Sequence, residues 1–349
     1  MRILFAGTPS AALPRDVARL GHEVLFPAET DWWAAMQAGV PPDRYADALW
    51  AACKAARPDA LVVHKGWHWW HERERWAVPA EVLWGLRKLV PAILYLCADD
   101  PAATPVTIAL GLPAPCDVWL TTCPGIVDAP LHAGRYCARI EEFWLAWDED
   151  VRPQVDPELA GVQVALTGHP YYRPFPAPHY QLGFATVRRD LVRRAIECGL
   201  RPGIWGPSTW TEESQGGDPK LAAWYRGWLD PSQIHVVHGS VGACVGTHLV
   251  EGRRYESGRC VWTLGAGGVL VHELRPGLAD EFGDAALWFR PGDIEGALSL
   301  CERLSADHEL SARMRAEGRA LVLERHTWVH RAARLVELAE EARRPAPYH

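Results

Sequence analysis

Arginine, glycine and proline residues gather around one apolar segment in the second half of the chain. Arg259 precedes a short run that ends in small residues at Gly267 and Gly268, and the turn formed by Pro276 and Gly277 follows the next apolar segment. A helix that ends in small residues, then a buried strand, then a Pro-Gly turn places backbone amides and flexible loops at the carboxyl edge of a sheet. Doubly wound folds bind their ligands at that edge. Gly267 and Gly268 also fit the left-handed glycine with which helices commonly end before a strand.

Three histidines have spacings that metal sites use on helices. His64, His68 and His71 are separated by four and three residues. The glycine and tryptophans between them do not fit a regular helix, and no acidic partner is fixed beside them. We therefore expect no metal site.

Short apolar runs alternate with longer segments of helical period along the whole chain, which is typical of a parallel sheet with helices on its faces. In the first half we predict strands at 2–7, 22–27, 60–64, 92–97 and 117–121. A helix is expected at 43–56, where apolar side chains recur at three- and four-residue steps. Five such strands make a complete Rossmann-like domain.

The polar segment 149–161 contains two prolines and no sustained period, so it is interpreted as a linker. The same alternation then begins again. Strands are expected at 162–167, 202–205, 234–238, 269–273 and 286–289, and helices at 180–198, 219–228, 258–266 and 293–304. After Asp307 the chain becomes strongly helical, and such an extension can cross back over the first domain. The fold class is therefore α/β with two Rossmann-like domains.

Length and composition set outer bounds on function. A chain of 349 residues exceeds what one hydrophobic core usually organises and fits two domains. Hydrophobic residues at 48% and charged residues at 23% are ordinary globular values, which exclude a disordered or fibrous chain. The net charge of −7 provides no basic field, so nucleic acid is not expected as a partner.

Cysteine use and hydropathy indicate a cytoplasmic protein. Nine scattered cysteines without a CxxC pair predict reduced thiols in the core. No apolar stretch approaches the roughly 18 residues that a membrane span needs, and the amino terminus does not fit a signal peptide. Eighteen tryptophans are unusual, and the cluster of Trp67, Trp69 and Trp70 is either core packing or an aromatic platform.

Four blocks of the second half resemble, in order, the carboxy-terminal domain of group 1 glycosyltransferases, in particular the branch related to the spore maturation protein CgeB. The blocks are Val164 to Gly168; Gly203 to Gly206 with Trp210; Arg259 to Gly268 with Pro276, Gly277, Leu278 and Phe282; and Gly318 with Arg319 and the segment from His326 to Arg331. The resemblance covers 162–335, and the first half is similar more loosely. It implies the GT-B architecture, with an acceptor-side domain at 1–150, a nucleotide-sugar domain at 162–335 and a helical tail at 336–349.

The resemblance also implies an activity of the hexosyltransferase type. A sugar passes from a nucleotide-diphosphate sugar to an acceptor that the sequence does not identify, without a metal or another cofactor. Arg259 is the first choice for the diphosphate, whose negative charge grows as the glycosidic bond breaks; the alternative is a solvated arginine at a helix end. Gly206 and Trp210 belong either to a loop that meets the base or ribose, or to a simple turn.

The same architecture indicates candidate bases in the first domain. Asp99 and Asp100 follow a predicted strand and His64 ends another, so each is expected at an edge that faces the acceptor. A carboxylate or imidazole there can orient or deprotonate a hydroxyl group. The alternative for the two aspartates, which precede a proline, is a turn and helix start.

One departure from the family concerns acidic residues. Many group 1 transferases place a glutamate where Trp262 stands, to hold the ribose, and a second acid where Arg254 stands. Glu251, Glu256 and Glu273 are the nearby carboxylates that can substitute, although each is interpreted as a surface charge. The departure puts a retaining mechanism in doubt.

Three other functions remain open. A GT-B protein that binds nucleotide sugars or carbohydrates without catalysis fits the missing glutamates, and a sugar-nucleotide epimerase shares the architecture. The first nine residues also resemble the start of methionyl-tRNA formyltransferase, but no later segment supplies the asparagine, histidine and aspartate of that enzyme. We favour the glycosyltransferase.

Overall fold

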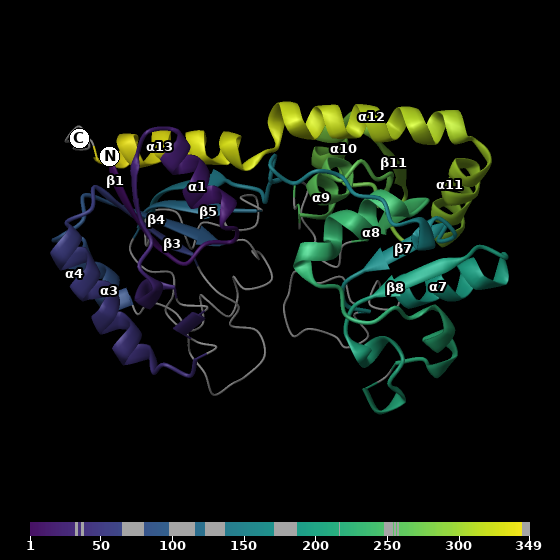
Figure 1. The fold of residues 1–349 in the computed structure, drawn as a ribbon, viewed down its shortest axis with the longest axis horizontal. Helices are drawn as coiled ribbons and strands as arrows, with labels where there is room; N and C mark the ends of the chain where they lie inside the picture. The colour runs from purple at the N-terminus through teal and green to yellow at the C-terminus, as the bar shows by residue number, and fades with distance from the viewer. Residues whose placement is uncertain are drawn as a thin grey trace. The chain divides into compact units, whose positions relative to one another are not determined.

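The computed structural model describes residues 1–31, 34–35, 38–64, 80–97, 116–122, 137–170, 187–215, 217–247, 254, 256 and 258–343. Contacts within the chain divide it into two units (Figure 1). The first unit contains Met1–Leu145 and Trp328–His349, and the second contains Ala146–Thr327. Each unit has its own sheet and its own hydrophobic core.

The first unit is built on a parallel sheet, which has six strands within the described residues, in the order β2-β1-β3-β4-β5-β6. Its strands are β1 Arg2–Ala6, β2 Glu23–Leu25, β3 Ala60–His64, β4 Ala92–Cys97, β5 Cys116–Thr121 and β6 Cys137–Glu142. Ile3, Leu4 and Phe5 of β1 are all fully buried. Such a continuous apolar run is expected where helices cover both faces of a parallel sheet.

Four α-helices of this unit lie within the described residues. They are α1 Ala12–Arg19, α3 Pro42–Ala56, α4 Ala80–Leu86 and α13 Trp328–Arg343. The helix α3 begins with proline in its first turn, where proline is favoured, and Tyr45, Leu49 and Cys53 recur along it at four-residue steps, buried in the core. The last helix, α13, packs against α1, β4 and β5 (Figure 1). The carboxyl end of the chain therefore belongs to the first unit.

The second unit contains a parallel sheet of five strands within the described ranges, in the order β11-β10-β9-β7-β8. Its strands are β7 Val164–Thr167, β8 Pro202–Trp205, β9 Ala243–Gly246, β10 Leu270–Glu273 and β11 Ala286–Phe289. Its helices are α7 Val187–Glu197, α8 Ile234–Ser240, α9 Arg259–Gly265, α10 Pro276–Phe282, α11 Ile294–Ala306 and α12 His308–Arg325.

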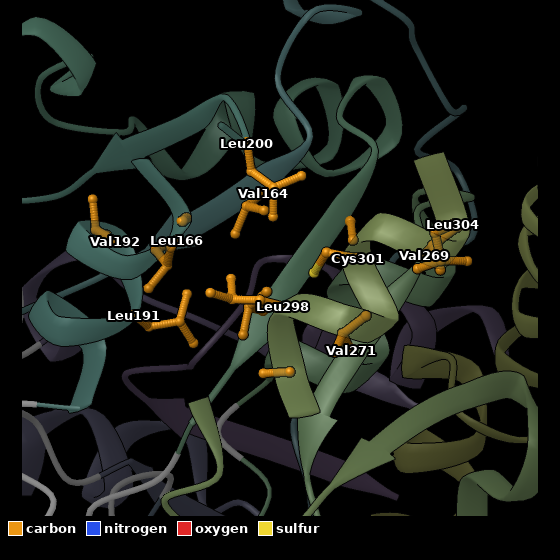
Figure 2. Packing of buried hydrophobic residues seen from close by; sticks show 14 of the residues in the cluster. Val164, Leu166, Leu191, Val192, Leu200, Val269, Val271, Leu298, Cys301 and Leu304 are labelled. Carbon is orange, nitrogen blue, oxygen red and sulfur yellow. The ribbon is translucent and has the colours of Figure 1, made fainter. Parts of the chain in front are cut away.

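Side chains of β7 alternate between two hydrophobic clusters, one on each face of the sheet. Val164 and Leu166 belong to the larger cluster, and Ala165 belongs to the smaller one. Figure 2 shows part of the larger cluster, with Leu298 of α11 between Leu191 of α7 and the strands. Trp210 belongs to this cluster and is fully buried, with its indole N–H donating to the carbonyl oxygen of Gly168 at 2.8 Å.

Two arginines of α12 hold the ends of other helices. Arg315 donates to the carbonyl oxygen of Gly239, near the end of α8, and to that of Gly267, just after α9, each at 2.9 Å. Arg319 donates to the carbonyl oxygen of Gly265, the last residue of α9. Cations near the carboxyl end of a helix also interact favourably with its dipole. The carboxyl end of α9 is therefore fixed by α12.

The structure confirms two parallel-sheet α/β units with a helical carboxy-terminal part, but it corrects two of the predicted elements. The predicted strand at 234–238 is helix α8, because Asp230 and Pro231 start a helical turn in front of it, and the strand lies later, at β9. The predicted helix at 219–228 is a short 3₁₀ turn, after which Tyr225 bridges to β8. Strand β6 has no counterpart among the predictions.

Six cysteines of the described ranges are found as free thiols, namely Cys53, Cys116, Cys198, Cys244, Cys260 and Cys301, and all of these except Cys198 are buried. Among the described residues, no helix combines the length and the apolar character that crossing a membrane would require.

His238 and His272 are buried imidazoles of the second unit. His238 lies between the hydroxyl groups of Thr167 and Thr263, with Nε2 at 3.3 Å and Nδ1 at 3.1 Å. Burial, helped by the charge of Arg259, lowers the pKa of His238 to about 3. Burial also lowers the pKa of His272 to about 3. Both imidazoles are therefore neutral in the folded protein at pH 7.

We expect the free energy of unfolding to decrease as the pH falls from 7.5 to 5.5. The folded pKa of both histidines lies below the unfolded value near 6.5, so the unfolded state binds more protons below that pH. Their contribution is present in full above pH 6.5 and is lost toward pH 3, at up to about 1.4 kcal/mol per pH unit for each imidazole. Urea unfolding at several pH values measures this slope. His238→Gln should reduce it, whereas the exposed His330→Gln should leave it unchanged; equal slopes in both variants would contradict the assignment.

Trp210→Ala should strongly destabilise the second unit. The change opens a cavity in the larger cluster and removes the donor to Gly168, for which we expect a loss of about 3–5 kcal/mol. Trp228→Ala is the matched control, because Trp228 is 67% exposed and an exposed change costs within about 0.5 kcal/mol. Urea unfolding of both variants tests the difference, and similar midpoints would be inconsistent with this packing.

Candidate functional site

The carboxyl ends of the parallel strands in the second unit meet at one edge of the sheet. Residues that follow these strands include Gly168 after β7, Gly206 after β8, Thr247 after β9 and Arg275 after β10. Ligands of doubly wound α/β proteins bind outside this edge. The candidate site is therefore defined by the residues of these four strand ends.

A glycine turn after β7 forms the floor of the site. Gly168 has a φ of 110°, and a Cβ atom there would lie 3.4 Å from Nη1 of Arg188 and 3.6 Å from Nη2 of Arg259. A Cβ atom on Gly206 would collide with the carbonyl oxygen of Gly168, the same oxygen that accepts from Trp210. Gly206 and Trp210 thus shape the turn from behind, and the indole of Trp210 is buried in the core.

Arg259 is the first residue of α9 and directs its guanidinium toward two strand ends. Nη2 donates to the carbonyl oxygen of Thr167 at 3.2 Å, and Nη1 donates to that of Thr247 at 3.4 Å. The first distance is at the upper limit of the usual range for an N–H···O hydrogen bond, and the second exceeds that range. The Nε atom is buried without a partner, and no described carboxylate lies within ion-pair distance of Arg259. The hydrogen-bonding capacity of this cation is therefore only partly used.

A second guanidinium, that of Arg188, lies at the same strand ends and was not predicted from the sequence. Arg188 of α7 donates from Nη2 to the carbonyl oxygen of Thr247 and from Nη1 to that of His169, each at 2.8 Å, and from Nε to the Thr247 hydroxyl at 2.9 Å. Arg188 is buried. The available signal was its place on the apolar stripe of 187–197, three and seven residues before Leu191 and Ala195.

The start of α9 is closed by a carboxylate of the chain. Glu256 is fully buried, and its two oxygens accept from the amides of Gly258 at 2.5 Å and Cys260 at 2.9 Å. Burial raises the pKa of Glu256, while the amides and Arg259 oppose that rise. The expectation of a surface charge at Glu256 is wrong, because this carboxylate satisfies helix amides that otherwise lack partners.

The expectation of a surface charge at Glu273 is also wrong. Glu273 is fully buried at the end of β10 and accepts from Arg275 at 2.6 Å. Pro276 and Gly277 follow and begin α10, so they lie at the same edge of the sheet as Arg275. Arg254 donates to the carbonyl oxygen of Gly277 at 3.3 Å and pairs with Glu281.

Gly267 and Gly268 lie at the opposite end of α9 from Arg259. The helix connects the carboxyl end of β9 to the amino end of β10, and the two glycines precede β10. Gly267 has a φ of 72°, and a Cβ atom on Gly268 would collide with the carbonyl oxygen of His238. The structure therefore accounts for both glycines by the ending of a helix and does not bring them together with Arg259.

Of the remaining candidates, His64 of the first unit is the one that lies among the described residues. His64 ends β3, and burial lowers its pKa to about 4, so it is neutral at pH 7 and a weak base. Asp99, Asp100, His68, His71 and Glu251 lie outside the described residues. No cluster of three or more metal-ligating side chains is found within the described ranges.

Comparison with known proteins relates part of the chain to one family. Residues 188–337 match a family model described as Glycosyl transferase-like, a segment that begins at Arg188 and contains Arg259. No curated protein sequence matches the chain.

Solved structures share the fold over almost the whole chain. Sucrose-phosphate synthase from Thermosynechococcus elongatus is 12% identical, with a TM-score of 0.65 and 98% of each chain covered. Anabaena HepE in complex with UDP and glucose is 11% identical, with a TM-score of 0.60 over 98% of this chain and 100% of that one. A glycosyltransferase from Rickettsia africae is 10% identical, with a TM-score of 0.61 and 98% of each chain covered. The chain therefore has the GT-B fold, and 188–337 are similar to glycosyl transferase-like proteins.

Proposed function

We propose that this protein is a glycosyltransferase of the GT-B type that transfers a hexosyl group from a nucleotide-diphosphate sugar to an acceptor. The observation that carries the proposal is the incompletely bonded guanidinium of Arg259, beside Arg188, at the carboxyl edge of the second sheet. Arginine matches the geometry of phosphate oxygens and forms charge-assisted hydrogen bonds with them. UDP is the first donor nucleotide to test, because HepE has a similar fold and is described in complex with UDP.

The two guanidinium groups offer a reason for an anion to bind. Arg188 and Arg259 donate to one carbonyl oxygen of Thr247, so two like charges lie close together. Their repulsion is reduced when a diphosphate is bound nearby, and the negative charge that develops on the leaving diphosphate increases this stabilisation. The proposed roles are therefore electrostatic: Arg259 contacts the diphosphate, and Arg188 holds Thr247 and the glycine turn in place.

We also propose membership of the CgeB-like branch. Its four sequence blocks fall on β7 with its turn, on the end of β8, on α9, and on α12 with the start of α13. The last block touches the third, because Arg319 donates to Gly265 and a Cβ atom on Gly318 would lie 2.7 Å from Leu264. The contact between blocks far apart in the sequence supports this assignment.

For the acceptor, we propose a base from the first unit. Asp99 and Asp100 follow β4 in the sequence and remain the proposed carboxylates, while the lowered pKa of His64 makes it the weaker candidate. Release of UDP that depends on an acceptor distinguishes a transferase from a binding protein. Conversion of the donor without an acceptor would instead favour an epimerase.

UDP should bind without a divalent metal. The proposed contacts are arginine side chains, which neutralise a diphosphate without an ion. Calorimetric titration after treatment with EDTA should give a Kd within about twofold of the untreated value, a difference of roughly 0.4 kcal/mol. Binding that disappears with EDTA and returns with Mg²⁺ would contradict the metal-free proposal.

Arg259→Ala should lower kcat/KM at least about a hundredfold, or roughly 2.7 kcal/mol, with a smaller loss of donor affinity. The reason is that charge on the leaving diphosphate is largest in the transition state. Arg259→Lys should restore only part of the rate, because lysine keeps the charge without the two-pronged geometry. Release of UDP from UDP-glucose, with water as acceptor until another is found, provides the measurement.

Arg303→Ala is the control, because Arg303 is an exposed arginine of α11. It should retain the rate of the unmodified protein. If Arg259→Ala is folded by circular dichroism and is equally active, Arg259 is not in the site and the proposed diphosphate contact must be abandoned.

A further inference from the structure

The helix α9 exposes only two of its side chains, and both lie on one face. Cys260, Val261, Thr263 and Leu264 are buried, whereas Arg259 and Trp262 are partly exposed. Residues three apart on a helix are neighbours on its surface. The cation proposed to hold the diphosphate therefore has a tryptophan directly beside it.

The indole of Trp262 leans toward the carboxyl edge of the sheet. Its six-membered ring covers Gly258, where a Cβ atom would lie 2.6–2.7 Å from Cζ2, Cε2 and Cη2. Gly258 precedes the helix and has a φ of 87°. Helical side chains generally point back toward the start of their helix, and the start of α9 is the end that carries Arg259.

At the start of α9, Arg259 provides a positive charge and Trp262 provides a flat apolar surface. Glu256 already accepts from the amides of Gly258 and Cys260 at the start of α9, so the proposed contact with the diphosphate is assigned to the guanidinium of Arg259. Trp262 adds an aromatic face and one N–H donor, and this N–H donates no hydrogen bond within the described part of the chain. The C–H face of a sugar ring packs on an aromatic face, and a hydroxyl oxygen can accept from the indole N–H.

We propose that Trp262 is a specificity-determining residue of the donor site, packing against a sugar ring that is joined directly to the diphosphate on Arg259. The inference rests on the proposed function. Two rings have this chemistry: the ribose of the nucleotide and the transferred sugar. A tryptophan here selects a ring by how well the ring packs on the indole, whereas a carboxylate would accept hydrogen bonds from the hydroxyl groups of the ring.

Calorimetric titration with three probes tests the proposal. Inorganic pyrophosphate carries no sugar ring, UDP adds the ribose and base, and UDP-glucose adds the transferred sugar. Trp262→Ala should weaken UDP or UDP-glucose about tenfold to a hundredfold, as for other stacked rings, and should leave pyrophosphate within about twofold. Trp262→Phe should recover most of the loss. Trp84→Ala, which removes a tryptophan 59% exposed in the first unit, should change none of the three affinities.

The pattern of losses identifies the ring. Weaker binding of UDP assigns the contact to the nucleoside, and weaker binding of UDP-glucose alone assigns it to the transferred sugar. If pyrophosphate weakens equally, Trp262 only supports the fold of α9 and the proposal is overturned. Equal affinities in all variants overturn it as well, whereas an unmodified protein that binds no probe refutes the proposed function itself.

Fluorine NMR of protein labelled with 5-fluorotryptophan gives a second readout that does not depend on affinity. The signal of Trp262 is assigned as the one missing from Trp262→Phe. It should shift with UDP or UDP-glucose and remain in place with pyrophosphate. A signal that no probe moves would place the indole outside the site.

Discussion

The carbonyl oxygen of Thr247 accepts from both Arg188 and Arg259, and the arrangement of the site depends on this shared contact. Burying a guanidinium is costly unless its N–H groups are satisfied. Here the partners are the carbonyl groups of Thr167, His169 and Thr247 at the ends of β7 and β9, so backbone dipoles at the sheet edge stabilise the two guanidinium charges. Gly168 adopts a φ of 110° that favours glycine, Trp210 donates to its carbonyl oxygen, and Gly206 leaves room for that oxygen.

Much of the fold follows from patterns that the sequence states locally. Strands such as β1 and β4 are apolar along nearly their whole length, and α3 has its buried residues at regular steps. The segment 234–238 was predicted as a strand because its run Ile-His-Val-Val-His is rich in β-branched residues, while the Asp-Pro pair before it starts a helix. Short helices cannot be separated from strands by periodicity alone. Strand β6 is half polar, so its membership of the sheet depends on pairing with β5.

Some residues of the candidate site were predicted from the sequence and others were missed, and the difference has a physical reason. Arg259 stood out because glycine and proline surround it in the sequence, but Gly267 and Gly268 stand at the other end of the same helix. Arg188 is 59 residues from Thr247 and meets it only through the order of the strands. Glu256 and Glu273 resembled surface charges because sequence shows charge and not the donors that satisfy it.

The helix α9 is restrained at both ends, by Glu256 at its start and by Arg315 and Arg319 of α12 at its finish. Such a helix cannot slide or rotate about its axis without breaking buried hydrogen bonds. The side chains on its exposed face are consequently ordered before any ligand arrives, and the entropy of ordering them is lost during folding rather than during binding. A substitution in α12 that removes these hydrogen bonds would leave the exposed side chains of α9 to be ordered when the proposed ligand binds. The affinity for that ligand would then depend partly on α12, the last helix of the second unit.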